Sequence, residues 1–250
     1  MGTSAGALTG ALYAAGYRPN EVASILSERT PWSYLVRAPH ATADYSHAPC
    51  WPRAAPHVLT RAARRPQSLN EAPLGGLLRL DGAVARLREL LPPTFAGLER
   101  RYACGVVDAA GNHRTISSGS LPEAVVASMA IPCLFRAVDM PWQEDGPFKD
   151  GGKADRVGLL PWLSAPALAT PGRTTICHVI ARSSPFSGND DVAAMAKAAP
   201  PSAGPIVVCR SPKSDQSLLG LPDFEPQFVA ARDRAAATLA RAGGSAVTAR

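Results

Sequence analysis

The pattern of apolar and polar residues along the chain alternates between helical and strand-like segments. Near the start, residues 7–15 are nearly all small or apolar, with Leu8 and Leu12 four positions apart and Gly16 as a C-terminal glycine. Further helices are predicted over residues 21–29, 81–91, 122–130, 191–198 and 227–242, and strands over residues 102–108, 113–117, 174–181 and 205–209. Strands that alternate with helices predict an α/β fold with a mainly parallel sheet.

Several predicted helices carry residues that favour a helix start. Asn20 and Asp81 each stand where an N-cap is expected, and Ser120 with Glu123 has the spacing of a capping box. The last two predicted strands are rich in β-branched residues, which is typical of strands buried in a parallel sheet. These signals divide the chain into short, alternating elements without an internal repeat.

Residues 31–74 differ from the rest because prolines recur there among histidines and tryptophans. This texture predicts a lid-like surface excursion rather than part of the sheet. At the other end, Gly243 and Gly244 follow the last apolar pattern, so residues 243–250 are predicted to form a flexible tail. Residues 1–242 are then expected to form one domain.

Composition and charge narrow the function classes. The 250 residues are 46% hydrophobic and 18% charged, so a sizeable core is expected. The formal net charge of +6 suits contact with anionic surfaces such as phospholipid headgroups. The arginine clusters lack interleaved aromatic residues, so no nucleic-acid partner is predicted.

The five cysteines indicate neither a metal site nor a disulfide framework, because their number is odd and no C-x-x-C occurs. No metal and no cofactor is predicted, and Cys177 and Cys209 are expected to be reduced core residues. No apolar run reaches the length of a transmembrane helix, and no signal peptide is recognisable.

The stretch Gly2-Thr3-Ser4-Ala5-Gly6 has the pattern G-x-S-x-G and runs into the first helix. It fits a nucleophile elbow, a tight strand-to-helix turn with a serine at its tip. Gly2 and Gly6 would let strand and helix pass closely, and the Ala5 N–H could stabilise an oxyanion at the helix N-terminus. The alternative is an ordinary glycine and serine turn.

A nucleophilic serine needs a base, and none of the five histidines occupies an obvious position for one. His178 lies within a strand pattern and is expected to pack in the core. The other candidate is Asp150, which follows a predicted strand and precedes Gly151 and Gly152. The glycines would let the backbone turn sharply and present the carboxylate, although Asp-Gly is also common in ordinary turns.

Together, these motifs resemble the patatin-like phospholipases. Three segments carry the resemblance: GTSAGALTGALYAAG at the start, SSGSLPEAVVASMAIPCLFRAV in the middle, and DGG at 150–152. The middle segment is similar to the family's A-x-x-A-S-x-A-I-P-x-x-F block, here Ala124 to Phe135. The three occur in the family's order, and the resemblance covers roughly residues 2–161.

The resemblance implies a three-layer fold and a serine esterase that degrades lipids, phospholipids or acylglycerols, through a Ser-Asp dyad. Ser4 matches the family's nucleophile and Asp150 its aspartate. Asp150 would take the Ser4 proton as the hydroxyl attacks the ester, forming an acyl-enzyme. The resemblance further implies a protein inside the cell, in the cytoplasm or peripherally bound at a membrane or lipid-droplet surface.

The sequence departs from the family before the elbow. Family members carry a first strand and a glycine-rich oxyanion loop upstream, which this sequence lacks, so it is expected to be truncated or a degenerate homologue. Two alternatives remain open. One is a catalytically impaired remnant that binds lipids or a partner; the other is an α/β-hydrolase with Ser-Asp-His order.

Overall fold

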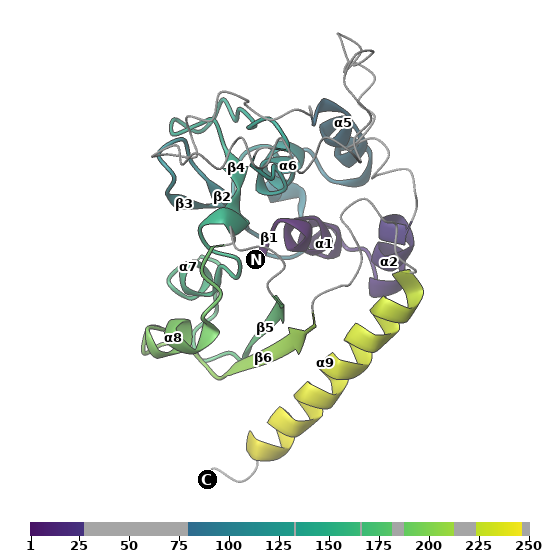
Figure 1. The fold of residues 1–250 in the computed structure, drawn as a ribbon, viewed down its shortest axis with the longest axis vertical. Coiled ribbons are helices and arrows are strands. Elements are labelled where there is room, and N and C mark those ends of the chain that lie inside the picture. Colours follow the sequence, from purple (N-terminus) through teal and green to yellow (C-terminus); the bar gives the residue numbers. More distant parts are fainter. Residues whose placement is uncertain (28–79, 133, 166, 182–187, 213–223, 247–250) are drawn as a thin grey trace, which may run out of the picture.

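The computed structural model describes residues 1–27, 80–132, 134–165, 167–181, 188–212 and 224–246, which form an α/β fold (Figure 1). The helices are α1 (Ala5–Ala14), α2 (Pro19–Ser27), α5 (Asp81–Leu90), α6 (Leu121–Ser128), α7 (Leu159–Leu163), α8 (Val192–Lys197) and α9 (Phe224–Ala246). The strands are β1 (Gly2–Thr3), β2 (Cys104–Val107), β3 (His113–Ile116), β4 (Lys149–Asp150), β5 (Thr175–Ile180) and β6 (Ile206–Ser211), with 3-10 turns η3 (Phe95–Gly97) and η4 (Gly151–Lys153). The predicted lid, residues 31–74, lies outside the described residues.

Strand β2 is the centre of the first sheet. On one edge, β1 runs parallel to it with Thr3 opposite Gly105, and β4 runs antiparallel with Asp150 opposite Val106. The other edge is occupied along its whole length by antiparallel β3. Strands β1 and β4 therefore approach each other end to end along a single edge of β2. This topology brings the residue after Thr3 next to Asp150.

The prediction of a mainly parallel sheet was wrong for this sheet, because two of its three strand pairings are antiparallel. A short turn joins β2 to β3, and strands joined by so short a connection can pair only in the antiparallel sense. The Asp108 carboxylate stabilises that turn by accepting a 2.8 Å hydrogen bond from the Asn112 N–H. The β5–β6 pair is parallel, as predicted.

Helices α1 and α6 pack beside the first sheet and hold most of its core (Figure 1). In α1 the small residues Ala7 and Ala11 are completely buried together with Leu12. In α6 every residue but Glu123 is buried. Small and β-branched side chains let both helices lie close to β2 and to each other, which fixes the direction in which α1 leaves β1.

The second region consists of α7, α8 and the β5–β6 pair, which lie below β1 in Figure 1. Its separate core comprises Leu159, Leu163, Cys177, Val179, Val192 and Met195. The Gly188 N–H donates to the Gly152 carbonyl over 2.8 Å and links this region to the turn after β4. Cys177 and Cys209 are buried free thiols, as the sequence predicted.

Helix α9 packs against β6 and runs along the outside of the second region (Figure 1). It continues through Gly243 and Gly244 to Ala246, beyond the end predicted at residue 242, and residues 247–250 lie outside the described part. None of the helices in the described ranges combines the length and apolarity needed to cross a bilayer.

The predicted helix caps differ in detail from the observed ones. Helix α2 begins at Pro19, which suits a first helical position, so Asn20 lies inside the helix. Leu80 rather than Asp81 occupies the N-cap of α5. Ser120 is the N-cap of α6, but its hydroxyl donates to the Glu123 carboxylate instead of accepting from the helix backbone.

Candidate active site

Ser4 lies at the turn from β1 into α1 with φ 55° and ψ −127°, the only positive φ of a non-glycine residue among those described. Such a conformation is costly for a residue with a Cβ and persists only where the surroundings hold it. Gly2 makes the sharp turn possible, because a Cβ at that position would lie 2.1 Å from the Gly6 carbonyl oxygen. This local geometry is compatible with the predicted nucleophile elbow.

Gly6 has a different surrounding from Gly2. A Cβ built at Gly6 meets no described atom within 4 Å, and the residue is exposed on the first turn of α1. The expectation that both glycines allow a close passage of strand and helix therefore holds for Gly2 and was wrong for Gly6. The motif gave no signal of this difference, because it depends on which way each Cα–H bond points.

Asp150 ends β4 and is only 5% exposed. Its N–H donates to the Ala130 carbonyl over 3.0 Å, just beyond α6. Gly151 allows the chain to turn against β2, since a Cβ there would lie 2.3 Å from the Gly105 carbonyl oxygen. The Gly152 N–H donates to Asp150 Oδ1 over 2.7 Å and fixes the rotation of the carboxylate.

The structure brings Ser4 and Asp150 into direct contact. The Ser4 hydroxyl donates to Asp150 Oδ2 over 2.6 Å, although the two residues are 146 positions apart in the sequence. A hydroxyl donating to a carboxylate at this distance makes a strong, charge-assisted hydrogen bond. No third side chain is interposed, so the carboxylate itself is positioned to take the serine proton.

Burial raises the pKa of Asp150 to about 6, against the opposing effect of the hydrogen bonds from Ser4 and Gly152. Removing a carboxylate from water disfavours its charged form, whereas donors aimed at it favour that form. The carboxylate is then ionised at neutral pH and a stronger base than an exposed aspartate. Both properties suit a group that must accept a proton and later return it.

The backbone N–H of Ser4 is also held. It donates to the hydroxyl oxygen of Ser128 over 3.1 Å, and that hydroxyl donates to the Gly105 carbonyl over 2.6 Å. Ser128 is the last residue of α6 and is completely buried. Ser128 lies within the middle segment of the family resemblance, but no role is predicted for it from the sequence; the available signal is a hydroxyl at the end of a run of apolar residues, 124–127.

The N-terminus of α1 leaves backbone N–H groups without partners in the helix. Ala5 is the first residue of α1, and N–H groups in the first turn of a helix have no intrahelical carbonyl to bond. Ala5 and Gly6 are both exposed and directly follow Ser4 in the chain. Because the Ser4 N–H already donates to the Ser128 hydroxyl, the Ala5 N–H is the next backbone donor along the chain after Ser4.

Two of the five histidines fall in the described residues. His178 is exposed, and its Nε2 lies 2.9 Å from the Ser211 hydroxyl, so the expectation of a packed core histidine was wrong. Side chains alternate along β5, which points His178 away from the covered face. His113 Nε2 is buried without a described hydrogen-bond partner, and burial lowers its pKa. Neither of these two histidines hydrogen-bonds to the side chain of Ser4 or Asp150.

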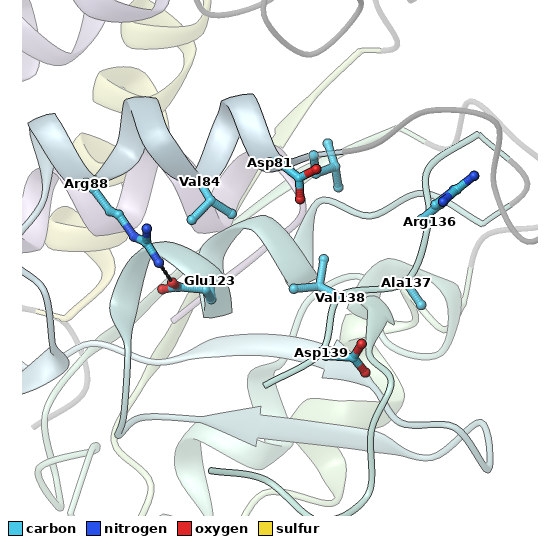
Figure 2. A pocket seen from close by; sticks show the side chains of 9 residues that line it. Asp81, Val84, Arg88, Glu123, Arg136, Ala137, Val138 and Asp139 are labelled. Atoms are coloured by element: carbon cyan, nitrogen blue, oxygen red, sulfur yellow. Dashed lines mark hydrogen bonds and ion pairs between the residues drawn. The ribbon is translucent and has the colours of Figure 1, made fainter. Parts of the chain in front are cut away.

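A pocket of about 480 Å³ lies elsewhere, between α5, the start of α6 and residues 136–139 (Figure 2). Its walls carry charges of both signs, including an ion pair between Arg88 and Glu123. Ser4 and Asp150 do not line it. The pocket contains no nucleophile paired with a base, so the elbow is the stronger candidate for the reactive centre. In the described ranges, no cluster of three potential metal ligands occurs.

A family model described as patatin-like phospholipase matches residues 1–161 of the chain. The matched part includes β1 to β4, Ser4, Asp150 and Ser128, and it ends within α7. No curated protein matches the chain.

Proposed function

The chain belongs to the patatin-like phospholipase family, and we propose that it hydrolyses acyl esters of lipids with Ser4 as the nucleophile and Asp150 as the base. The observation that carries the proposal is the 2.6 Å hydrogen bond from the Ser4 hydroxyl to the Asp150 carboxylate at a strained strand-to-helix turn. A serine held in this way is presented to a substrate and has its proton acceptor in place.

In the acylation step, Ser4 Oγ attacks the ester carbonyl while its proton passes to Asp150 Oδ2. The tetrahedral intermediate carries a negative oxygen, toward which the Ala5 N–H can donate. When the intermediate collapses, the bond to the alcohol breaks and the alcohol leaves with the proton from Asp150. An acyl group then remains on Ser4.

Deacylation repeats these steps with water as the nucleophile. Asp150 takes a proton from the attacking water, and the second intermediate expels the Ser4 oxygen, which recovers its proton from Asp150. The fatty acid leaves and the hydrogen bond between the two residues is restored. One carboxylate thus acts as base and acid in both halves of the cycle.

A lipid substrate would be reached at an aggregate surface, because acyl lipids assemble into bilayers or droplets rather than dissolving. The formal charge of +6 favours approach to anionic headgroups. We therefore expect hydrolysis of vesicles containing an anionic phospholipid to exceed that of neutral vesicles at low salt, and the difference to shrink as salt screens the charges.

The decisive experiment combines activity with covalent labelling. The purified chain is assayed with a nitrophenyl ester and with phospholipid vesicles, and treated with a fluorophosphonate probe whose attachment site is found by mass spectrometry. We expect the label on Ser4, and we expect Ser4→Ala and Asp150→Asn each to lower hydrolysis by about a thousandfold or more. Ser118→Ala, which changes an exposed turn serine, is the matched control and should leave hydrolysis unchanged.

Two outcomes would contradict the proposal. If Ser4→Ala keeps its hydrolysis, another residue is the nucleophile. If the native chain is folded but neither hydrolyses esters nor accepts the probe, catalysis is impaired, and vesicle flotation then tests the alternative of a lipid-binding or partner-binding protein.

The pH dependence provides a further test. Asp150 must be ionised to accept the proton, and its pKa is about 6 in the folded chain. We expect kcat/KM to fall about tenfold for each pH unit below about 6 and to level off above about 7. A profile that stays flat down to pH 4 would show that Asp150 is not the base.

A further inference from the structure

Ser128 is a buried hydroxyl at the end of α6, with no exposed surface. A hydroxyl removed from water costs stability unless it is hydrogen-bonded, so its partners indicate why it is there. Its partners are the nucleophile and the central strand: it accepts from the Ser4 N–H and donates to the Gly105 carbonyl.

The pairing of β1 with β2 shows what this hydroxyl replaces. The Gly2 N–H donates to the Ala103 carbonyl over 3.1 Å, as in an ordinary parallel ladder. Two residues further along, the regular pattern would join the Ser4 N–H to the Gly105 carbonyl directly. Instead, the Ser128 hydroxyl lies between these two groups and bonds to both. It therefore extends the ladder by one link at the point where β1 must leave β2 to form the turn.

The same end of α6 also holds the aspartate. The Ala130 carbonyl, two residues after Ser128, accepts the hydrogen bond from the Asp150 N–H over 3.0 Å. A single short segment thus contacts the backbone on both sides of the hydrogen bond between Ser4 and Asp150. A shift of this segment would change the separation of the two reacting groups.

We propose that Ser128 is a positioning residue, whose hydroxyl bridges the Ser4 N–H and the Gly105 carbonyl and so holds the nucleophile in the elbow conformation at hydrogen-bonding distance from Asp150. The proposal rests on the proposed function, because it assigns Ser128 its effect through Ser4. Ser128 does not contact the substrate and takes no proton. It acts by keeping the Ser4 backbone in a conformation that the chain would otherwise leave.

The test compares Ser128→Ala with Val125→Ala, a variant in the same helix at an equally buried position. Both remove core atoms, but only the first removes the bridge. We expect Ser128→Ala to lower kcat and the rate of fluorophosphonate labelling at Ser4 by about tenfold or more with KM within about twofold, the effect of losing one positioning hydrogen bond. At a temperature where both variants are equally folded, Val125→Ala should keep the native kcat.

A second measurement does not depend on activity. Hydrogen exchange of the Ser4 amide, followed by NMR, should accelerate about tenfold or more in Ser128→Ala, while exchange of the Gly2 amide changes little because its acceptor is intact. If Ser128→Ala does not fold, Ser128→Cys retains the volume but only weak hydrogen bonding and receives the same measurements.

The outcomes separate this proposal from the proposed function. Native kcat in Ser128→Ala, equal losses in both variants at equal stability, or unchanged exchange of the Ser4 amide would overturn the positioning role. Absence of hydrolysis and labelling in the native chain would overturn the proposed function instead, and the exchange measurement would still decide whether Ser128 holds the Ser4 backbone.

Discussion

The sheet around β2 and the β5–β6 pair achieve their shapes in different ways. Around β2, backbone segments approach so closely that a single Cβ at Gly2 or Gly151 would collide with a carbonyl. In β5, side chains alternate between a covered and an open face, and Ile176 and Ile180 remain 57% and 49% exposed. The sheet around β2 depends on glycines, which have no Cβ, at the points of closest approach. The β5–β6 pair depends on large apolar side chains that cover one face.

This difference matches where the proposed chemistry lies. Ser4 and Asp150 both lie in the closely packed region, where hydrogen bonds and glycines hold the Ser4 hydroxyl 2.6 Å from the Asp150 carboxylate. A reaction that needs atoms placed within a fraction of an ångström requires such constraint. Strands β5 and β6 lie beyond the part that matches the family, and they contain neither Ser4 nor Asp150. We expect the two regions to respond differently to small changes.

The largest effect is expected for alanine at Gly2, and the same substitution at Gly6 provides the contrast. Gly2→Ala places a Cβ 2.1 Å from a backbone oxygen, so it should destabilise the chain by about 3 kcal/mol and lower hydrolysis about a hundredfold or more. Gly6→Ala meets open space within a helix and should raise the free energy of unfolding by about 0.5 kcal/mol. Urea denaturation and ester hydrolysis measure both effects.

Comparing Gly2→Ala with Gly6→Ala tests whether a glycine of this motif is required because of a close backbone approach or because of its place in the motif. Equal destabilisation by both substitutions would contradict the structural account. A loss of hydrolysis in Gly6→Ala without a loss of stability would indicate that the space beside Gly6 is needed by the substrate.

The second effect concerns the charge buried in the closely packed region. The pKa of Asp150 is raised above its ordinary value of 3.8, so the folded chain binds this proton more tightly than the unfolded chain. The stability from this group is fully present below about pH 4 and is lost as the pH rises through about 6. Asp150→Asn removes the charge and should raise the free energy of unfolding at pH 8 by up to about 3 kcal/mol.

Measuring the free energy of unfolding at two pH values checks whether Asp150→Asn stabilises the chain as expected. The advantage of Asp150→Asn should be largest at pH 8 and should disappear near pH 4, where the native side chain is also neutral. The same variant should be inactive at both values. A variant that is less stable than the native chain at pH 8 would mean that the ionised carboxylate stabilises the fold and that its pKa is not raised.

Much of the closely packed region could be predicted from the sequence because its signals are local. Gly2 to Gly6 and Asp150 to Gly152 are short runs in which glycine indicates a sharp turn beside a reactive group. Helices α1, α5 and α6 and strands β2 and β3 fall within a few residues of where the apolar pattern placed them. The helix start at Pro19 and the cap at Leu80 differ from the predicted positions by one or two residues, because helix ends are defined only to within that margin.

The features of the fold and the site that could not be predicted depend mainly on contacts between residues far apart in the sequence. Ser128 meets Ser4 across 124 positions and Gly105 across 23, and nothing in a single helix pattern identifies those partners. The antiparallel direction of β4 likewise follows from the path of the chain rather than from strand composition, whereas that of β3 follows from the short turn after β2. In β5, an apolar run of six residues cannot reveal whether one face or both are covered.

The smallest effect is expected on β5, where neighbouring residues face opposite ways. Val179 is 6% exposed and Ile180 is 49% exposed, and threonine keeps the β-branched shape at either position. Val179→Thr buries a hydroxyl without a ready partner and should cost about 2 kcal/mol in urea denaturation. Ile180→Thr exposes the hydroxyl to water and should change stability by less than about 0.5 kcal/mol. Similar costs at both positions would mean that the Ile180 face is covered in the folded chain, and the contrast between the two regions would then fail.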